Sequence, residues 1–160
     1  MNRLRGTVHR LQTSGEITHV EVRVADHVFH AVVLDAPETV PYLRVRAPVD
    51  VLFKESEVFL ARPPLGPIST RNRFPGRVRR IVTGRILARV EIVSDVGVIE
   101  SLVTRQAVED LGLREGDNII WLVKTTEVSL MACAENSVPD TGSGMNHESP
   151  PVRNTGSPDL

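Results

Sequence analysis

The sequence predicts a mainly β protein made of two tandem OB-fold-like barrels, each with five strands and a short helix. The first observation behind this prediction is an internal repeat: residues 2–61 align with residues 72–131 at a constant offset of 70 positions and without a gap. The second is that each copy contains five short strand-like segments with a helical segment expected between the third and fourth. This order is typical of the oligonucleotide-binding type of barrel.

The repeat rests on identities that recur in the same order in both copies. The identical pairs near the start are Asn2 and Asn72, Arg3 and Arg73, Gly6 and Gly76, Val8 and Val78, Arg10 and Arg80, and Thr13 and Thr83; later pairs include Lys54 and Lys124, and Glu57-Val58 and Glu127-Val128. A unit of this size buries only about 60% of the surface of its unfolded chain. Each copy is therefore expected to need the other, or another chain, to complete its core.

In the first copy, apolar alternation predicts strands over Leu4–Leu11, Glu16–Ala25, Val28–Leu34, Val49–Phe53 and Val58–Leu60. The second and third of these are expected to form a hairpin around an Asp26-His27 turn. Pro37 and Pro41 weaken any helix between the third and fourth strands.

The second copy repeats this plan with strands predicted over Arg77–Val82, Ile86–Val93, Val98–Val103, Asn118–Val123 and Val128–Met131. Thr104 is suited to cap a short helix that runs through Leu111, and Gly112 supplies the stop.

The chain is divided by composition into four parts. Residues 1–62 form the first repeat, 63–68 a proline-rich linker, 69–132 the second repeat and 133–160 a tail. The linker is expected to be extended and semi-rigid because it is rich in proline. The tail has almost no large apolar residues, which predicts disorder.

Composition places the chain among ordinary globular proteins: 41% of residues are hydrophobic, 24% are charged, and the net charge is -1. Cys133 is the single cysteine, which excludes an intrachain disulfide and a thiolate zinc site. The N-terminus lacks the apolar run of a signal peptide, and no stretch approaches 18 apolar residues. We therefore expect a cytoplasmic protein with no membrane partner.

A set of hydrogen-bond donors with few acceptors is the candidate binding site. Its members are Ser69, Thr70 and Arg71 before the first strand of the second copy, Thr104 at the helix start, and Lys124, Thr125 and Thr126 between the last two strands. Such a lining suits a fully ionised tetrahedral oxyanion, which offers only acceptors, and disfavours monoprotonated phosphate, whose proton needs an acceptor. From the residues alone, the alternative is that these hydroxyls cap turns and that the lysine is solvated.

Several segments of the second copy resemble a known family when taken in order. They are the opening Ser69-Thr70-Arg71-Asn72 followed by Gly76, then Val103-Thr104, then 109–116 with the sequence EDLGLREG, and then 123–128 with the sequence VKTTEV. This pattern resembles the molbindin, or Mop/TOBE, family of molybdate-binding domains. The resemblance covers residues 69–131 closely and residues 2–61 less closely.

The resemblance implies a barrel pair of the di-Mop type that binds molybdate or tungstate at interfaces between domains. It implies binding positions at Ser69, Arg71, Thr104, Lys124 and Thr125. The position of another family hydroxyl is occupied by Ala107, which would remove one hydrogen bond.

The first copy departs further from the family pattern. Met1 precedes Asn2, so the serine and arginine are missing, and Leu34 and Pro37 stand where Thr104 and Ala107 stand in the second copy. Lys54 remains, and a composite pocket that combines Lys54 with residues 69–72, including Asn72, is a further possibility.

Other features give no sign of catalysis. Glu21 and Glu91 lack an acid-base partner in the sequence, and no nucleophile with its base or phosphate-binding glycine loop is present. The histidines align with arginines, as His9 and His19 do, or flank a turn without a third ligand, as His27 and His30 do. The sequence thus predicts a protein that is not an enzyme.

The predicted function is binding of molybdate or tungstate by a homo-oligomer for intracellular storage, homeostasis or sensing. The alternative is an oxyanion-responsive regulator that contacts DNA or a protein partner. That alternative rests on a run of arginines without an intervening acid: Arg71, Arg73, Arg77, Arg79, Arg80, Arg85 and Arg89.

Overall fold

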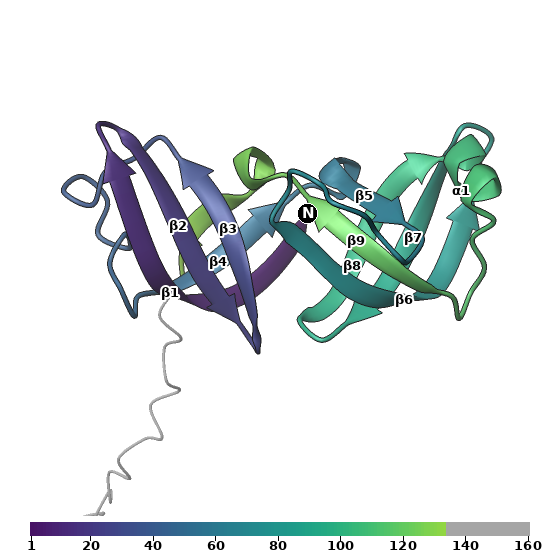
Figure 1. Ribbon diagram of the computed structural model, residues 1–160, viewed down its shortest axis with the longest axis horizontal. Coiled ribbons are helices and arrows are strands. Elements are labelled where there is room, and N and C mark those ends of the chain that lie inside the picture. The colour runs from purple at the N-terminus through teal and green to yellow at the C-terminus, as the bar shows by residue number, and fades with distance from the viewer. Residues whose placement is uncertain (134–160) are drawn as a thin grey trace, which may run out of the picture.

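The computed structural model describes residues 1–133, so the predicted tail lies outside the described residues except for Cys133. Two curled five-stranded sheets lie side by side along the long axis of the molecule (Figure 1). The elements are β1 (Asn2–Ser14), β2 (Ile17–Val24), β3 (His27–Val33), β4 (Pro48–Phe53), the 3-10 turn η1 (Glu55–Glu57), β5 (Val58–Ala61), β6 (Asn72–Thr83), β7 (Leu87–Ser94), β8 (Gly97–Thr104), α1 (Arg105–Leu111), β9 (Asn118–Val123), η2 (Thr125–Glu127) and β10 (Ser129–Ala132).

The two repeats exchange their fifth strands. The strand order is β10-β4-β1-β2-β3 in one sheet and β5-β9-β6-β7-β8 in the other. β5 of the first repeat therefore pairs with β9 of the second, and β10 of the second pairs with β4 of the first. The expectation that each copy forms its own complete barrel is wrong in this respect, whereas each copy does need the other to complete its core.

The exchange keeps the 70-residue symmetry. Phe59 of β5 lies opposite Leu122 of β9, and Ser129 of β10 lies opposite Leu52 of β4. Each short 3-10 turn, η1 or η2, carries the chain out of one sheet and into the other, so separating the repeats would strip a strand from both sheets.

The first strand of each repeat bends by a β-bulge at the same place, between Val8 and Arg10 in β1 and between Val78 and Arg80 in β6. The bend lets one strand pair with two neighbours as the sheet curls. Close to it, a Cβ atom at Gly6 would lie 2.6 Å from a methyl group of Val22, and one at Gly76 would lie 2.5 Å from a methyl group of Ile92. This close approach explains why glycine occupies both equivalent positions.

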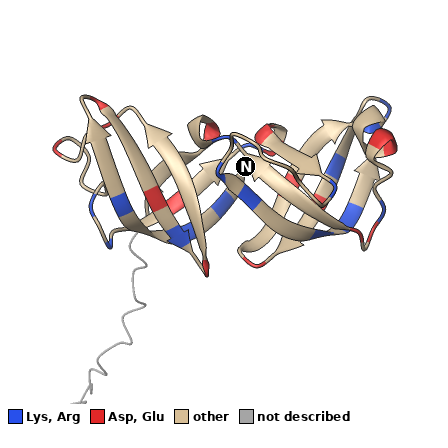
Figure 2. Ribbon diagram, in the orientation of Figure 1, with Lys and Arg blue, Asp and Glu red and all other residues tan. Residues whose placement is uncertain are grey.

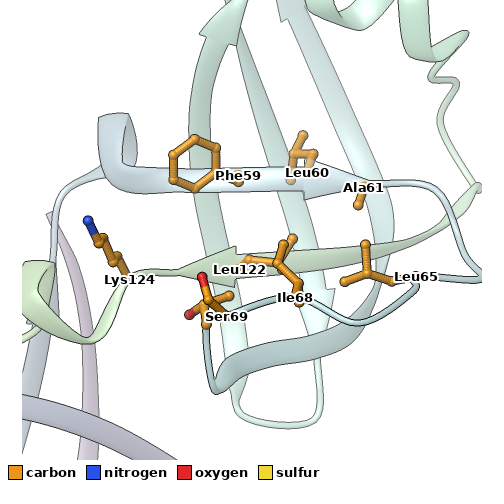
Figure 3. A pocket seen from close by; sticks show the side chains of 9 residues that line it. Phe59, Leu60, Ala61, Leu65, Ile68, Ser69, Leu122 and Lys124 are labelled. Atoms are coloured by element: carbon orange, nitrogen blue, oxygen red, sulfur yellow. The ribbon is translucent and has the colours of Figure 1, made fainter.

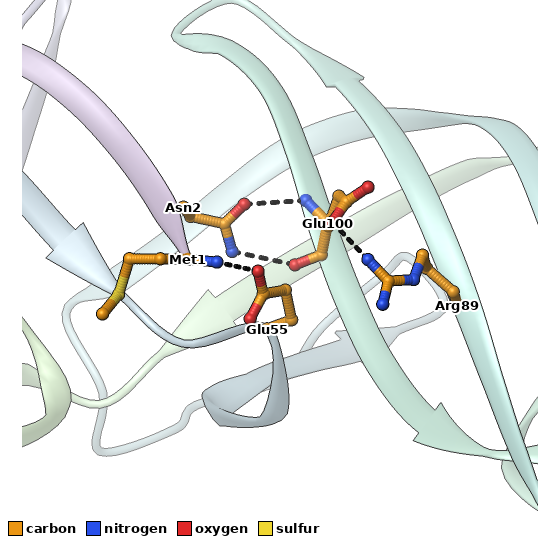
Figure 4. Close-up of polar contacts among 5 residues, drawn as sticks. All are labelled: Met1, Asn2, Glu55, Arg89 and Glu100. Atoms are coloured by element: carbon orange, nitrogen blue, oxygen red, sulfur yellow. Dashed lines mark hydrogen bonds and ion pairs between the residues drawn. The ribbon is translucent and has the colours of Figure 1, made fainter.

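Two asparagines at equivalent positions join the repeats. Asn2 donates through Nδ2 to the carbonyl of Glu100 and accepts from the Glu100 N–H, both at 2.9 Å (Figure 4). Asn72 makes the same two bonds with the backbone of His30, both at 2.7 Å. A carboxamide offers a donor and an acceptor side by side, so each asparagine pairs with the outer strand of the opposite repeat as a strand backbone would.

Aromatic side chains fill the seam between the sheets on one side. Phe29 and Phe53 come from the first sheet, and Phe74 and Trp121 come from the second. The ring centroids of Phe29 and Phe74 are 4.4 Å apart, and those of Phe74 and Trp121 are 4.7 Å apart. All four side chains are buried, and Trp121 is fully so.

Two local predictions need correction. A helix was expected in each unit, but residues 36–43 of the first unit form turns, consistent with the two prolines there, while α1 forms in the second unit. The first hairpin turns at Ala25–Asp26 rather than at Asp26-His27, because β2 ends at Val24 and β3 begins at His27. Ala25 adopts a positive φ of 51°, which a sequence pattern does not predict for a residue with a Cβ.

The segment between the repeats is held against the second one. Arg62 donates to the carbonyls of Leu111 and Gly112 at the end of α1 and forms an ion pair with Asp117 at 2.8 Å. Gly112 ends α1 in the left-handed conformation, as predicted. Within residues 1–133, no helix has the length and apolar character needed to cross a membrane.

Candidate functional site

A pocket at the junction of the repeats contains three of the predicted site residues. We call it the junction pocket, and its volume is about 380 Å³. Ser69, Thr70 and Lys124 line it together with an apolar wall made of Phe59, Leu60, Ala61, Leu65, Ile68 and Leu122 (Figure 3). The exchange of β5 brings Phe59 and Leu60 next to β9, so the pocket is built from both repeats.

Lys124 is the cation of the junction pocket. It lies between β9 and η2, its side chain is exposed, and it forms no ion pair within residues 1–133. None of the residues that line the pocket is a carboxylate. An anion that entered would therefore meet a positive charge without an opposing negative one.

The hydroxyl groups of the junction pocket differ in what they can offer. Thr70 donates its proton to the carbonyl of Val123 at 3.0 Å, so it presents an acceptor to the pocket. Ser69 is exposed next to it. Ser69 and Lys124 are thus the side-chain donors that the pocket makes available to a ligand.

Thr104 and Ala107 lie elsewhere in the molecule, at α1. The Thr104 hydroxyl caps this helix by accepting from the Ala107 N–H at 3.1 Å, as predicted for the helix start. Thr104 lines an open depression together with Arg85, Ile86, Arg105, Gln106 and Glu109, and shares no pocket with Lys124. Figure 1 shows α1 at the outer end of the second sheet, away from the seam.

Lys54 also stands apart from residues 69–72. It lines a pocket of about 410 Å³ with Thr126, and the carboxylates Glu57 and Glu127 line the same pocket. The composite pocket of Lys54 with residues 69–72 does not form within one chain. Thr125, the first residue of η2, is half-buried next to Lys124.

The remaining two predicted residues, Arg71 and Asn72, lie at the start of β6. Asn72 is buried, and both polar atoms of its side chain are engaged with His30. Arg71 is exposed, and its charge acts on His30. The pKa of His30 is lowered, first because burial penalises the imidazolium and second because of the Arg71 guanidinium, while Glu21 opposes the shift.

The run of arginines does not form a uniform cationic face. Arg79 forms an ion pair with Glu91 at 2.9 Å, Arg89 forms one with Glu100 at 2.8 Å, and Arg77 donates to the carbonyl of Gly116. Figure 2 shows basic and acidic positions spread over both sheets. Two of the seven positive charges in this run are therefore balanced by a neighbouring carboxylate.

Two groups of residues that the structure brings together were not predicted from the sequence. One is the apolar wall of the junction pocket, which depends on the strand exchange. The other is a cluster of His19, Glu21 and His30, whose ligand atoms all lie within 4.8 Å of one another. The correct register of the first hairpin would have predicted this cluster, because it pairs Glu21 with His30. The turn predicted at Asp26-His27 gives a different register.

Similarity to known proteins agrees with this fold. Residues 68–130 match the TOBE domain family. Molybdenum-pterin-binding protein 3 of Clostridium pasteurianum is 30% identical over 66 residues, which cover 41% of this chain and 97% of that protein. Molybdenum-pterin-binding protein 1 of the same organism is 33% identical over 66 residues, with the same coverage.

A solved structure extends the similarity to both repeats. The cytoplasmic molybdate-binding protein ModG, in a form with molybdate bound, superposes with a TM-score of 0.77 and 29% sequence identity. The superposition covers 82% of this chain and 96% of that chain. The superposition therefore spans both repeats, whereas each clostridial protein matches only 66 residues of this chain.

Two OB-fold-like sheets that exchange a strand, with a pocket built from both repeats, define a tandem barrel protein of the Mop type. The chain belongs to the molbindin, or Mop/TOBE, family, and its two repeats make it a member of the di-Mop type.

Proposed function

We propose that this protein binds molybdate or tungstate at the junction pocket without catalysing a reaction on the ion. The observation that carries the proposal is the lining of that pocket: Lys124 and Ser69 supply donors, and no carboxylate competes for them. Charge-assisted hydrogen bonds of this kind replace the hydration shell of a dianion. The molybdate-binding relatives support the choice of ion.

We further propose that a second copy of the chain completes the binding site. Thr104 and Lys124 are separated within one chain, so one chain alone offers an incomplete shell of donors. Both places expose apolar side chains: Phe59 is 63% exposed and Ile68 45% exposed at the junction pocket, and Ile86 is 76% exposed beside Thr104. Packing the α1 end of one copy onto the junction pocket of the next would bury these side chains and bring the donors together.

Such a contact joins two different surfaces of neighbouring copies, and we propose that it closes into a ring of subunits. An ion that binds only the assembled ring stabilises it by mass action. Reversible capture without chemistry suits storage, homeostasis or sensing of the ion in the cytoplasm.

Titration calorimetry with molybdate, tungstate, sulfate and phosphate tests the proposal, combined with sedimentation analysis of the subunit number. We expect heat of binding with molybdate and tungstate, little with phosphate, and an oligomer that the bound ion stabilises. Absence of heat with both metal oxyanions would overturn the proposal, and binding by a monomer would overturn the shared site.

A further inference from the structure

The cluster of His19, Glu21 and His30 lies on the first sheet, apart from the junction pocket. His19 and Glu21 are two residues apart on β2, and Glu21 pairs directly with His30 on β3. Alternate residues of a strand share a face, and directly opposed residues of an antiparallel pair do so too. The hairpin register therefore directs all three side chains to the same side of the sheet.

The distances within the cluster are close to those of a metal site. His19 Nε2 and His30 Nδ1 are 3.1 Å apart, and the two rings stack with an interplanar angle of 10°. Two imidazole nitrogens on one tetrahedral zinc ion stand about 3.3 Å apart, given Zn–N bonds of about 2.0 Å. The two nitrogens thus need to separate by only a few tenths of an ångström, and the two rings have to turn so that both lone pairs point at one ion.

Glu21 supplies the third ligand and the negative charge. All three ligand atoms lie within 4.8 Å of one another, so the carboxylate has to approach by at most about 1.5 Å to reach bonding distance. Rotation about the side-chain torsions of a half-buried glutamate allows this movement.

The surroundings hold the cluster in place. His30 is only 7% exposed, and Asn72 fixes its backbone through two hydrogen bonds of 2.7 Å. Rigid placement of a ligand by its neighbours favours metal binding because less order has to be created when the ion arrives. The remaining two ligands are half-buried, which leaves a path for the ion.

The second repeat shows that the histidines are not required by the fold. The positions equivalent to His19, Glu21 and His30 are Arg89, Glu91 and Glu100. There, Arg89 and Glu100 form an ion pair at 2.8 Å. The same scaffold thus carries an ion pair in one sheet and a pair of imidazoles with a carboxylate in the other.

We propose that His19, Glu21 and His30 bind a divalent transition-metal ion such as Zn²⁺, through two imidazole nitrogens and one carboxylate oxygen. Imidazole favours ions of the zinc, nickel and copper group over magnesium and calcium. Water fills the remaining coordination position. The Arg71 charge near His30 opposes the cation, so removing that charge should strengthen metal binding.

The test is calorimetric titration of the metal-free, full-length protein with Zn²⁺, without a polyhistidine tag and in a Cys133→Ser background that removes the thiol. We expect one Zn²⁺ per chain. His19→Gln and Glu21→Gln should each weaken binding by more than tenfold, and Arg71→Gln should strengthen it. His9→Gln serves as the matched control because His9 is exposed on β1 and outside the cluster.

Two further measurements keep the result interpretable. Zn²⁺ should raise the melting temperature of the unsubstituted protein but not that of His19→Gln, and bound Co²⁺ should show the visible absorption of a site with nitrogen and oxygen ligands. Equal affinities for the unsubstituted protein and for both cluster variants would overturn the proposal, as would the absence of Zn²⁺ binding. Molybdate titrations of the same variants report separately on the junction pocket.

Discussion

Asn72 holds His30 of the opposite repeat through two hydrogen bonds of 2.7 Å to its backbone N–H and C=O. Asn2 repeats the arrangement on Glu100. Each asparagine begins the first strand of one repeat and satisfies the outer strand of the other. The two repeats are therefore tied together in two places by the same pair of bonds.

Replacing Asn72 by aspartate should destabilise the protein. The carboxylate keeps the shape of the side chain but loses the donor, so it faces the His30 carbonyl as a second acceptor. We expect a loss of about 1 to 3 kcal/mol in the free energy of unfolding, measured by denaturant titration. An Asn72→Asp variant as stable as the unsubstituted protein would show that the two hydrogen bonds between Asn72 and His30 are not important for stability.

The exchange of β5 and β10 predicts that neither repeat folds alone as a monomer. Residues 1–68 without β10 leave one side of β4 unpaired, and residues 69–133 without β5 leave one side of β9 unpaired. Produced together, the two halves should associate in equal amounts and recover the β-sheet spectrum. A half that unfolds cooperatively as a monomer would contradict the exchange.

Gly76→Ala should destabilise the protein because the added Cβ would lie 2.5 Å from a methyl group of Ile92. Overpacking of this kind costs about 1 to 3 kcal/mol. Gly66→Ala is the matched control, since a Cβ there meets no atom within 4 Å. The two variants should therefore differ clearly in their denaturation midpoints, and equal midpoints would argue against the close approach of the strands.

The lowered pKa of Asp50 predicts that the protein loses stability in acid. Burial alone would raise its pKa, but hydrogen bonds from Arg3 and Cys133 and the charges of Arg3 and Arg5 lower the pKa below its ordinary value. A lowered pKa means that the ionised group stabilises the fold above about pH 4 and that this contribution disappears as the pH falls through the folded-state pKa.

Asp50→Asn should therefore flatten the dependence of stability on pH below about pH 4. Denaturant titrations across the acid range, performed on both proteins, measure this slope. Identical slopes would mean that another carboxyl group dominates acid unfolding.

Much of the fold could be predicted from the sequence because strands and helix ends depend on local features, namely the alternation of apolar residues and the residues that cap a helix. Alternation located the strands, and Thr104 and Gly112 marked the two ends of α1 correctly. The partner of the fifth strand could not be predicted in the same way. Val58–Ala61 has the same apolar pattern whichever sheet it joins, so this local pattern does not distinguish the two sheets.

The candidate site shows the same division. The residue types of the donor set were visible, but their grouping was not, because Thr104 and Lys124 share no pocket within one chain. Prediction of the cluster around His30 depended on the position of the turn between β2 and β3, which lies one residue earlier than expected. A turn at Ala25–Asp26 pairs Glu21 with His30, whereas a turn at Asp26-His27 would have paired Arg23 with it.

Lys124→Ala should weaken binding of molybdate by more than tenfold. It removes a charge-assisted contact worth about 1.5 to 3 kcal/mol. Titration calorimetry measures the change, and Arg10→Ala, which removes an exposed cation from β1, is the matched control. If Lys124→Ala keeps the affinity of the unsubstituted protein, the lysine has been assigned wrongly.

The most direct test of oxyanion binding at the junction pocket is a crystal structure of the protein grown with tungstate. Tungsten is located unambiguously by its anomalous scattering. We expect tungsten density next to Lys124 and Ser69 of one chain and close to Thr104 of a neighbouring chain. Tungsten density away from the junction pocket, or none at all, would contradict the account.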